Sequence, residues 1–134
     1  MDGGSMREYQ RKTSKYILPG NMYVQTIYQI RDYYRMKEEA QAVLDESPAP
    51  PDGMPKGKAE VSDPERRAMR RERYLKVVKI IDEARALIPE EYRVGVWNNV
   101  LYHDAFPADA DRTTYGRYKS MFVYRIAREL FLLD

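Results

Sequence analysis

Apolar residues recur every three or four positions along most of this chain, and that spacing places them on one face of an α-helix. The first such segment predicts a single long helix over residues 21–46, with Asn21 as its N-cap. Its apolar line consists of Tyr23, Ile27, Ile30 and Tyr34. A neighbouring line of Met36, Ala40 and Val43 widens the face towards the end of the helix.

A second long helix is predicted over residues 62–88. Ser62 or Asp63 can cap it, and Pro64 suits the first helical position. Its apolar line is Tyr74, Val77, Ile81, Ala84 and Ile88, widened by Val78, Ile80 and Leu87. Residues 47–61 contain prolines and glycines that exclude a regular element, so this stretch is a linker. Two amphipathic helices joined by such a linker should pair as an antiparallel hairpin over residues 20–88.

Residues 89–134 predict two further helices, which form a helix-turn-helix-like region. The first begins after Pro89 and has a wide apolar face that includes Trp97, with Gly95 indicating a close helix crossing. Residues 103–111 form an irregular connector, in which Phe106 is expected in the core and Asp111 as the next N-cap. The last helix runs from about Arg112 to 132, with an apolar line of Phe122, Ile126, Leu130 and Leu133. The predicted fold is therefore all-α: a basic N-terminal arm (1–19), a long antiparallel helical hairpin, and a C-terminal helix pair.

The composition narrows the chemistry of the chain. Its 134 residues include 43% hydrophobic and 33% charged residues, with a net charge of +2, so any nucleic-acid binding depends on where the charges lie. There is no cysteine, which excludes disulfides and thiolate chemistry. No apolar run is long enough for a membrane span, and the N-terminus has no apolar signal core, so we expect a cytoplasmic protein that does not contact membrane.

Catalytic and metal-binding residues are sparse. The connector holds His103, Asp104, Asp109 and Asp111, but this spacing is not that of a calcium loop, and a single histidine without a helical partner is a poor zinc site. The chain also lacks a glycine-rich phosphate loop. We therefore predict no metal, no cofactor and no enzyme activity.

The last helix carries five basic residues and no acidic residue from Arg112 to Arg128. One interpretation is the solvated face of a core helix. The other is a DNA-contacting helix, whose first residues reach base edges while later ones hold phosphates. The predicted DNA-binding residues are Arg112, Thr113, Thr114, Arg117, Tyr118, Lys119, Arg125 and Arg128. Secondary phosphate contacts are predicted for Arg11, Lys12, Arg66 and Arg70, where a merely solvated basic face is the alternative.

The stretches IPEEYR and FPADADRTTYGRYKSMFVYRIAREL resemble phage and prophage regulators with a sigma-factor region-four-like helix-turn-helix, such as the RinA and ArpU late-gene activators. The segments YILPGNMYVQTIYQIRDYYRMK and ESPAPPDGMPKG also resemble small clostridial prophage proteins. The resemblance implies a phage-encoded, DNA-binding transcriptional regulator in a bacterial host. The chain departs from the family where HDAFPADAD replaces the short apolar first helix of the motif.

A different function is compatible with the same residues. The helices and twelve tyrosines suit a phage protein-interaction module that docks on a host protein as an inhibitor or adaptor. RNA polymerase, a terminase component, or a defence nuclease such as a CRISPR effector would be the partner. The expected partners are thus double-stranded DNA or such a protein, and a homodimer through the hairpin is compatible with both.

Overall fold

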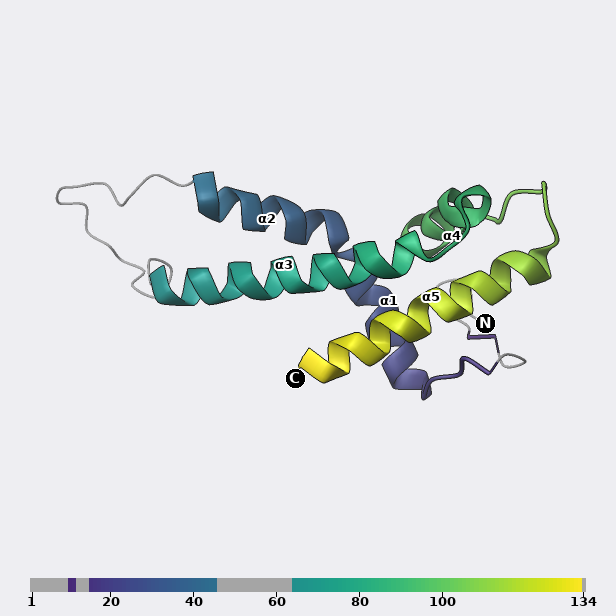
Figure 1. Cartoon of the computed structure of the whole chain (residues 1–134), viewed down its shortest axis with the longest axis horizontal. Coiled ribbons are helices and arrows are strands. Elements are labelled where there is room, and N and C mark those ends of the chain that lie inside the picture. Colours follow the sequence, from purple (N-terminus) through teal and green to yellow (C-terminus); the bar gives the residue numbers. More distant parts are fainter. Residues whose placement is uncertain (1–9, 12–14, 46–63, 134) are drawn as a thin grey trace, which may run out of the picture. The chain divides into compact units, whose positions relative to one another are not determined.

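The structure, a computed structural model, describes residues 10–11, 15–45 and 64–133 and contains five helices within these ranges (Figure 1). They are α1 (Gly20–Arg31), α2 (Tyr33–Asp45), α3 (Pro64–Ala86), α4 (Glu90–Tyr102) and α5 (Arg112–Leu133). No strand occurs in the described ranges, so the all-α prediction is confirmed. The predicted linker 47–61, the caps Ser62 and Asp63, and Lys12 lie outside the described residues.

The chain forms two compact units. One combines residues up to Asp32 with residues 80–134, and the other comprises residues 33–79. The boundaries fall inside the segment for which the sequence predicts a hairpin, and α3 contributes its N-terminal part to one unit and its C-terminal part to the other. We refer to them as the core unit (residues 1–32 and 80–134) and the hairpin unit (residues 33–79).

The prediction of one long helix over residues 21–46 is wrong, because the helix ends at Arg31 and α2 begins at Tyr33. The amide of Asp32 donates to the carbonyl of Gln29 at 3.1 Å, a tighter bond than the α-helical pattern. The interruption shifts the buried face by one position: Tyr33 is buried, whereas the predicted core residue Tyr34 is 48% exposed.

The predicted N-cap of the first helix is also wrong. The helix begins at Gly20 with Pro19 as the N-cap residue, and no side chain caps it. The carbonyl of Pro19 accepts a hydrogen bond from the amide of Tyr23 at 2.9 Å. Proline fixes its own φ and needs no amide partner, so it starts a helix without a side-chain cap.

The centre of the core unit lies where α1, α4 and α5 pack against one another. Trp97 of α4 meets Phe122 of α5 edge to face, with ring centroids 6.3 Å apart. Burying a large apolar side chain contributes about 1.5–3 kcal/mol, so this cluster is the main stabilising element of the unit. Its buried members are Tyr23, Ile27, Ile30, Ile81, Ala84, Ile88, Val96, Trp97, Val100, Tyr115, Phe122, Val123, Ile126 and Ala127. Leu87, predicted to widen the apolar line of α3, is instead exposed.

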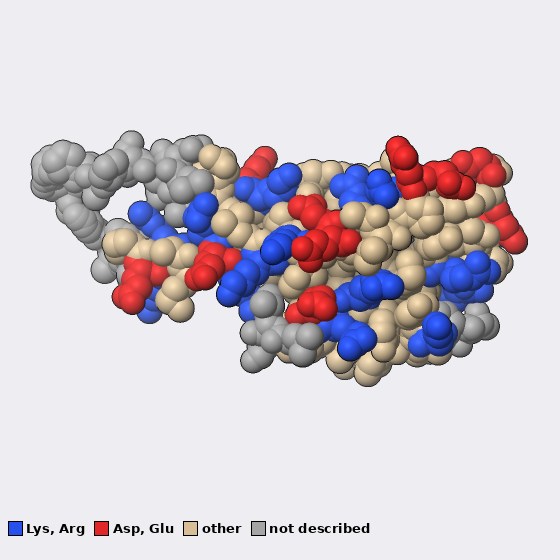
Figure 2. Space-filling model, in the orientation of Figure 1, with Lys and Arg blue, Asp and Glu red and all other residues tan. Residues whose placement is uncertain are grey.

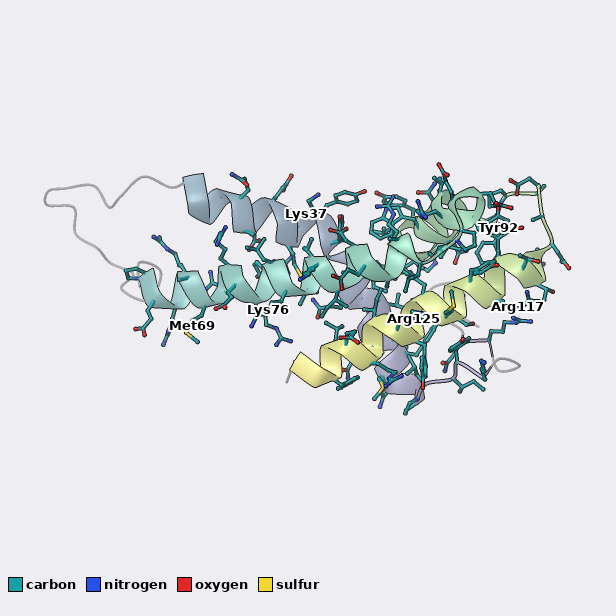
Figure 3. All side chains as sticks on the ribbon, in the orientation of Figure 1. Lys37, Met69, Lys76, Tyr92, Arg117 and Arg125 are labelled. Carbon is teal, nitrogen blue, oxygen red and sulfur yellow. The ribbon has the colours of Figure 1, made fainter. Side chains whose placement is uncertain are left out.

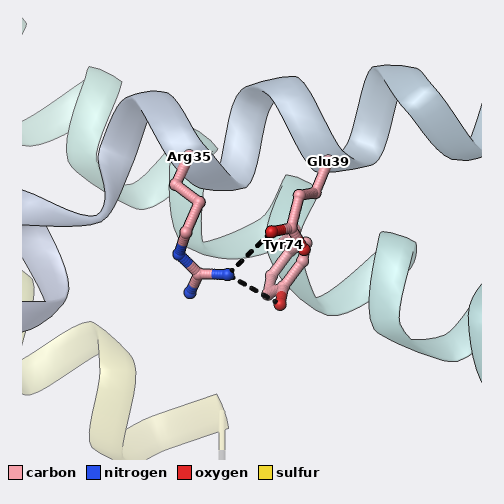
Figure 4. Close-up of polar contacts among 3 residues, drawn as sticks. All are labelled: Arg35, Glu39 and Tyr74. Atoms are coloured by element: carbon pink, nitrogen blue, oxygen red, sulfur yellow. Dashed lines mark hydrogen bonds and ion pairs between the residues drawn. The ribbon is translucent and has the colours of Figure 1, made fainter.

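In the hairpin unit, a polar contact joins α2 to α3 (Figure 4). One guanidinium nitrogen of Arg35 donates to Glu39 at 3.1 Å and to the hydroxyl of Tyr74 at 3.5 Å. The guanidinium also lies 5.6 Å from the centre of the Tyr74 ring, within reach of a cation–π interaction. The contact joins the two helices that the hairpin prediction pairs, while the full arrangement over residues 20–88 stays a proposal.

Candidate nucleic-acid interface

Gly95 of α4 sets the distance between α4 and the start of α5. A Cβ atom at this position would lie 2.6 Å from Cε1 of Tyr115 and 2.7 Å from Cδ of Pro107, both closer than such contacts allow. Glycine therefore lets the connector and α5 approach the α4 backbone directly. The close crossing predicted from Gly95 is present.

The connector between α4 and α5 is bonded to the helices on both sides. The hydroxyl of Tyr115 donates to Asp109 at 2.6 Å, and the ring of Phe106 stacks on that of Tyr115 with centroids 5.2 Å apart. At the other end, Arg31 of α1 donates to the His103 ring nitrogen at 2.8 Å. The connector thus fixes where α5 begins.

Asp111 caps α5, as predicted. Its carboxylate accepts from the amide of Thr113 at 3.3 Å, and its carbonyl accepts from the amide of Thr114 at 3.0 Å. The carboxylates of Asp109 and Asp111 therefore have structural partners. Among the residues that the structure describes, no group of three His, Cys, Asp or Glu side chains could hold a metal ion.

Two tyrosines next to this crossing have raised pKa values. The hydrogen bond to Asp109, and then burial, raise the pKa of Tyr115 to about 12. Tyr115 is only 1% exposed, so its neutral phenol is held in the folded state. Burial and the nearby Glu91 raise the pKa of Tyr92.

Three arginines lie on the outer side of α5: Arg117, Arg125 and Arg128. Their separations of eight and three residues keep them on one face of the helix, and all three are exposed. Figure 3 shows Arg117 near the start of α5 and Arg125 further along it. No ion pair joins them to another residue within the described ranges. We call these three residues the arginine stripe.

The other predicted DNA-binding residues do not all share this face. Thr114 lies beside the stripe and is half-buried. Tyr118 stacks on Tyr92 of α4, with ring centroids 5.1 Å apart and planes 21° from parallel. Its ring is thus already engaged within the core unit.

Arg112, Thr113 and Lys119 line a separate cavity of about 590 Å³, together with residues of the N-terminal arm. Arg125 and Arg128 border a second cavity of about 370 Å³, which Glu83 and Glu129 also line. The structure therefore divides the eight predicted residues among the stripe with Thr114 beside it, the larger cavity and the Tyr92 contact.

Of the predicted secondary phosphate contacts, Arg11 lies in the core unit, where its side chain passes within 3.5 Å of a Cβ built on Gly116. Arg66 and Arg70 are exposed on α3 in the hairpin unit. Residues 64–79 of α3 hold seven basic and two acidic residues, and Figure 2 shows Lys and Arg side chains recurring along this part of α3. In Figure 3, Met69 and Lys76 extend from the same part of α3.

A helix-turn-helix joins its two helices with a turn of about three or four residues. Here the connector between α4 and α5 comprises residues 103–111 and is longer than such a turn.

No helix of the described residues is long and apolar enough to cross a membrane. Comparison with known proteins gives no match to any family model, curated sequence or solved structure. The resemblance to region-four-like phage regulators therefore stays a hypothesis.

Proposed function

We propose that this chain is a phage-encoded, non-catalytic transcriptional regulator that binds double-stranded DNA with the outer face of α5. The observation that carries the proposal is the arginine stripe: three exposed guanidinium groups on one side of a helix held in place by the core unit. Arginine is the residue best suited to hold phosphate, because its planar fork matches two phosphate oxygens.

The length of the stripe fits a duplex groove. Arg117 and Arg128 are eleven residues apart, which corresponds to about 16 Å along a helix axis. The major groove of B-DNA is about 12 Å wide, so the two ends of the stripe can contact phosphates on its opposite walls. Thr114 lies in the first turn of α5 and would approach base edges, while Arg117, Arg125 and Arg128 would hold phosphates.

The experiment is an anisotropy titration of a labelled 30-base-pair duplex across salt concentrations. Replacing Arg117, Arg125 and Arg128 with glutamine should flatten the slope of log affinity against log salt by about 0.9 for each lost phosphate contact. The single variants Arg125→Gln and Lys37→Gln form a matched pair, because each removes one exposed positive charge. Lys37 lies in the hairpin unit and serves as the control, so only Arg125→Gln should lower the affinity for DNA. If the triple variant binds with wild-type affinity at every salt concentration, α5 is not the DNA-contacting helix.

A second candidate function is docking on a host or phage protein through the hairpin unit. Met69 is 64% exposed and Leu75 is 40% exposed on α3, beside the exposed Arg66 and Arg70. Exposed apolar side chains among cations suit a protein partner with an acidic rim. Under this function, Met69→Glu with Leu75→Glu abolishes binding to purified host RNA polymerase or terminase and leaves DNA affinity unchanged.

A further inference from the structure

The larger cavity of the core unit lies between the N-terminal arm and the start of α5. Gln10 fixes the arm, because its side-chain amide donates to the Leu18 carbonyl at 2.7 Å and accepts from the Leu18 amide at 2.6 Å. Arg11 follows directly and lies against α5 at Gly116. Gln10 and Arg11 are thus held as one wall of a cavity of about 590 Å³. We call it the arm cavity.

The side chains of the arm cavity favour an anion. Among the described residues that line it, Arg11, Arg112 and Lys119 are the cations and Asp111 is the single carboxylate. Asp111 already accepts from the amide of Thr113 as the cap of α5. Three cations from two separate segments therefore converge on one space, the arrangement that a phosphate group needs.

One further feature indicates that the anion belongs to a larger molecule. Phe106 also lines the cavity and is only half-buried, so its ring provides aromatic surface on which a base can lie.

We propose that the arm cavity binds a nucleotide. The phosphate lies among Arg11, Arg112 and Lys119, and the base lies against Phe106. The volume of the cavity exceeds what a phosphate alone would fill. The nucleotide is either a free mononucleotide or one residue of a single strand. This inference goes beyond DNA binding by the arginine stripe and does not depend on it.

The test is calorimetric titration of the whole chain with AMP, GMP, CMP and UMP, and with the single strands oligo(dA) and oligo(dT) of four residues. Adenosine and inorganic phosphate serve as probes that lack one half of the ligand. At least one mononucleotide or strand should bind saturably, at least tenfold more tightly than either half-ligand at equal ionic strength. Binding of a mononucleotide identifies a free ligand, and binding of the strands alone identifies a nucleotide within a strand.

Variants connect the binding to the cavity. The double variant Arg112→Gln with Lys119→Gln should lower the affinity for the nucleotide at least tenfold. Arg11→Gln should also lower this affinity, and it leaves the sequence of α5 unchanged. Arg117→Gln, on the same helix but outside the cavity, should change the affinity for the nucleotide less than twofold while lowering the affinity for duplex DNA. Absence of saturable binding for every mononucleotide and strand, or unchanged affinity in both cavity variants, overturns the proposal. Because the two ligands are measured separately, failure here leaves the DNA proposal standing, and the converse also holds.

Discussion

Gly95 and Gly116 provide a matched test of how α5 is positioned, because both glycines lie inside helices but in different surroundings. Alanine is favoured over glycine in a helix by about 1 kcal/mol. At Gly116, a new Cβ atom would meet Arg11 at ordinary contact distance, so Gly116→Ala should stabilise the core unit by up to about 1 kcal/mol. At Gly95, the same atom would meet Tyr115 at 2.6 Å and Pro107 at 2.7 Å.

The overlap at Gly95 outweighs the helix preference. Overpacking a filled site costs about 1–3 kcal/mol, and a shift of Tyr115 would also strain its hydrogen bond to Asp109, which is worth about 1.5–3 kcal/mol. We therefore expect Gly95→Ala to destabilise the core unit by about 1–2 kcal/mol net, so that the two variants differ by roughly 2–3 kcal/mol.

Urea unfolding followed by the fluorescence of Trp97 measures this difference, because Trp97 is the only tryptophan in the sequence and is buried in the core unit. Thermal unfolding should give the same order, at about 3 °C per kcal/mol for a domain of this size. If Gly95→Ala is as stable as Gly116→Ala, α4 and α5 do not cross as closely as the structure has them.

Two further predictions concern stability. The pKa of Tyr115, raised to about 12 by its bond to Asp109, means that this bond contributes fully below pH 10, the usual pKa of tyrosine. Its contribution to the free energy of unfolding is lost as pH rises from 10 through 12. Tyr115→Phe should cost about 1.5 kcal/mol of that free energy at pH 7 and should lack the part of the loss above pH 10 that comes from this bond, as measured by urea unfolding at pH 7 and above pH 10. Arg93 donates to the carbonyls of Ala86 at 3.2 Å and of Ile88 at 2.8 Å, which satisfies the C-terminal end of α3. Arg93→Ala should cost about 2 kcal/mol and Arg93→Lys nearly as much, because lysine cannot bond both carbonyls with one planar group; equal stability of Arg93→Ala and wild type would contradict this role.

Helix boundaries with a local chemical cause could be predicted from the sequence. Pro64 begins α3, Pro89 precedes α4, and Asp111 caps α5, all as expected. Each depends on the residue's own backbone restriction or side-chain acceptor, so neighbours in sequence suffice. The break at Asp32 has no such signal, because no proline or glycine lies beside it and the apolar spacing continues through it.

The division of the α5 residues could be predicted only in part. Arg112, Lys119 and Arg117 lie within about two turns of one helix, but helical spacing puts Arg112 and Lys119 on one face and Arg117 about 140° around the helix from Arg112. In the structure, the arm meets one side of α5 where Arg11 lies against Gly116, about a hundred residues away in sequence, and the paired bonds of Gln10 to Leu18 hold that part of the arm. Which side of α5 the arm covers depends on that packing and not on any local pattern.

The connector explains why a long link need not leave α5 loosely placed. A short turn restricts two helices through its few backbone torsions, whereas a longer one gives its ends more freedom. Residues 103–111 remove that freedom with side-chain bonds at each end: Arg31 to His103, Tyr115 to Asp109, and Asp111 to the first turn of α5. The side chains of Asp109 and Asp111 act here as acceptors that order the connector. The hydrogen bond between Tyr115 and Asp109 and the absence of a side chain at Gly95 therefore place the start of α5, on which both proposed binding sites depend, while the buried cluster holds the rest of the helix.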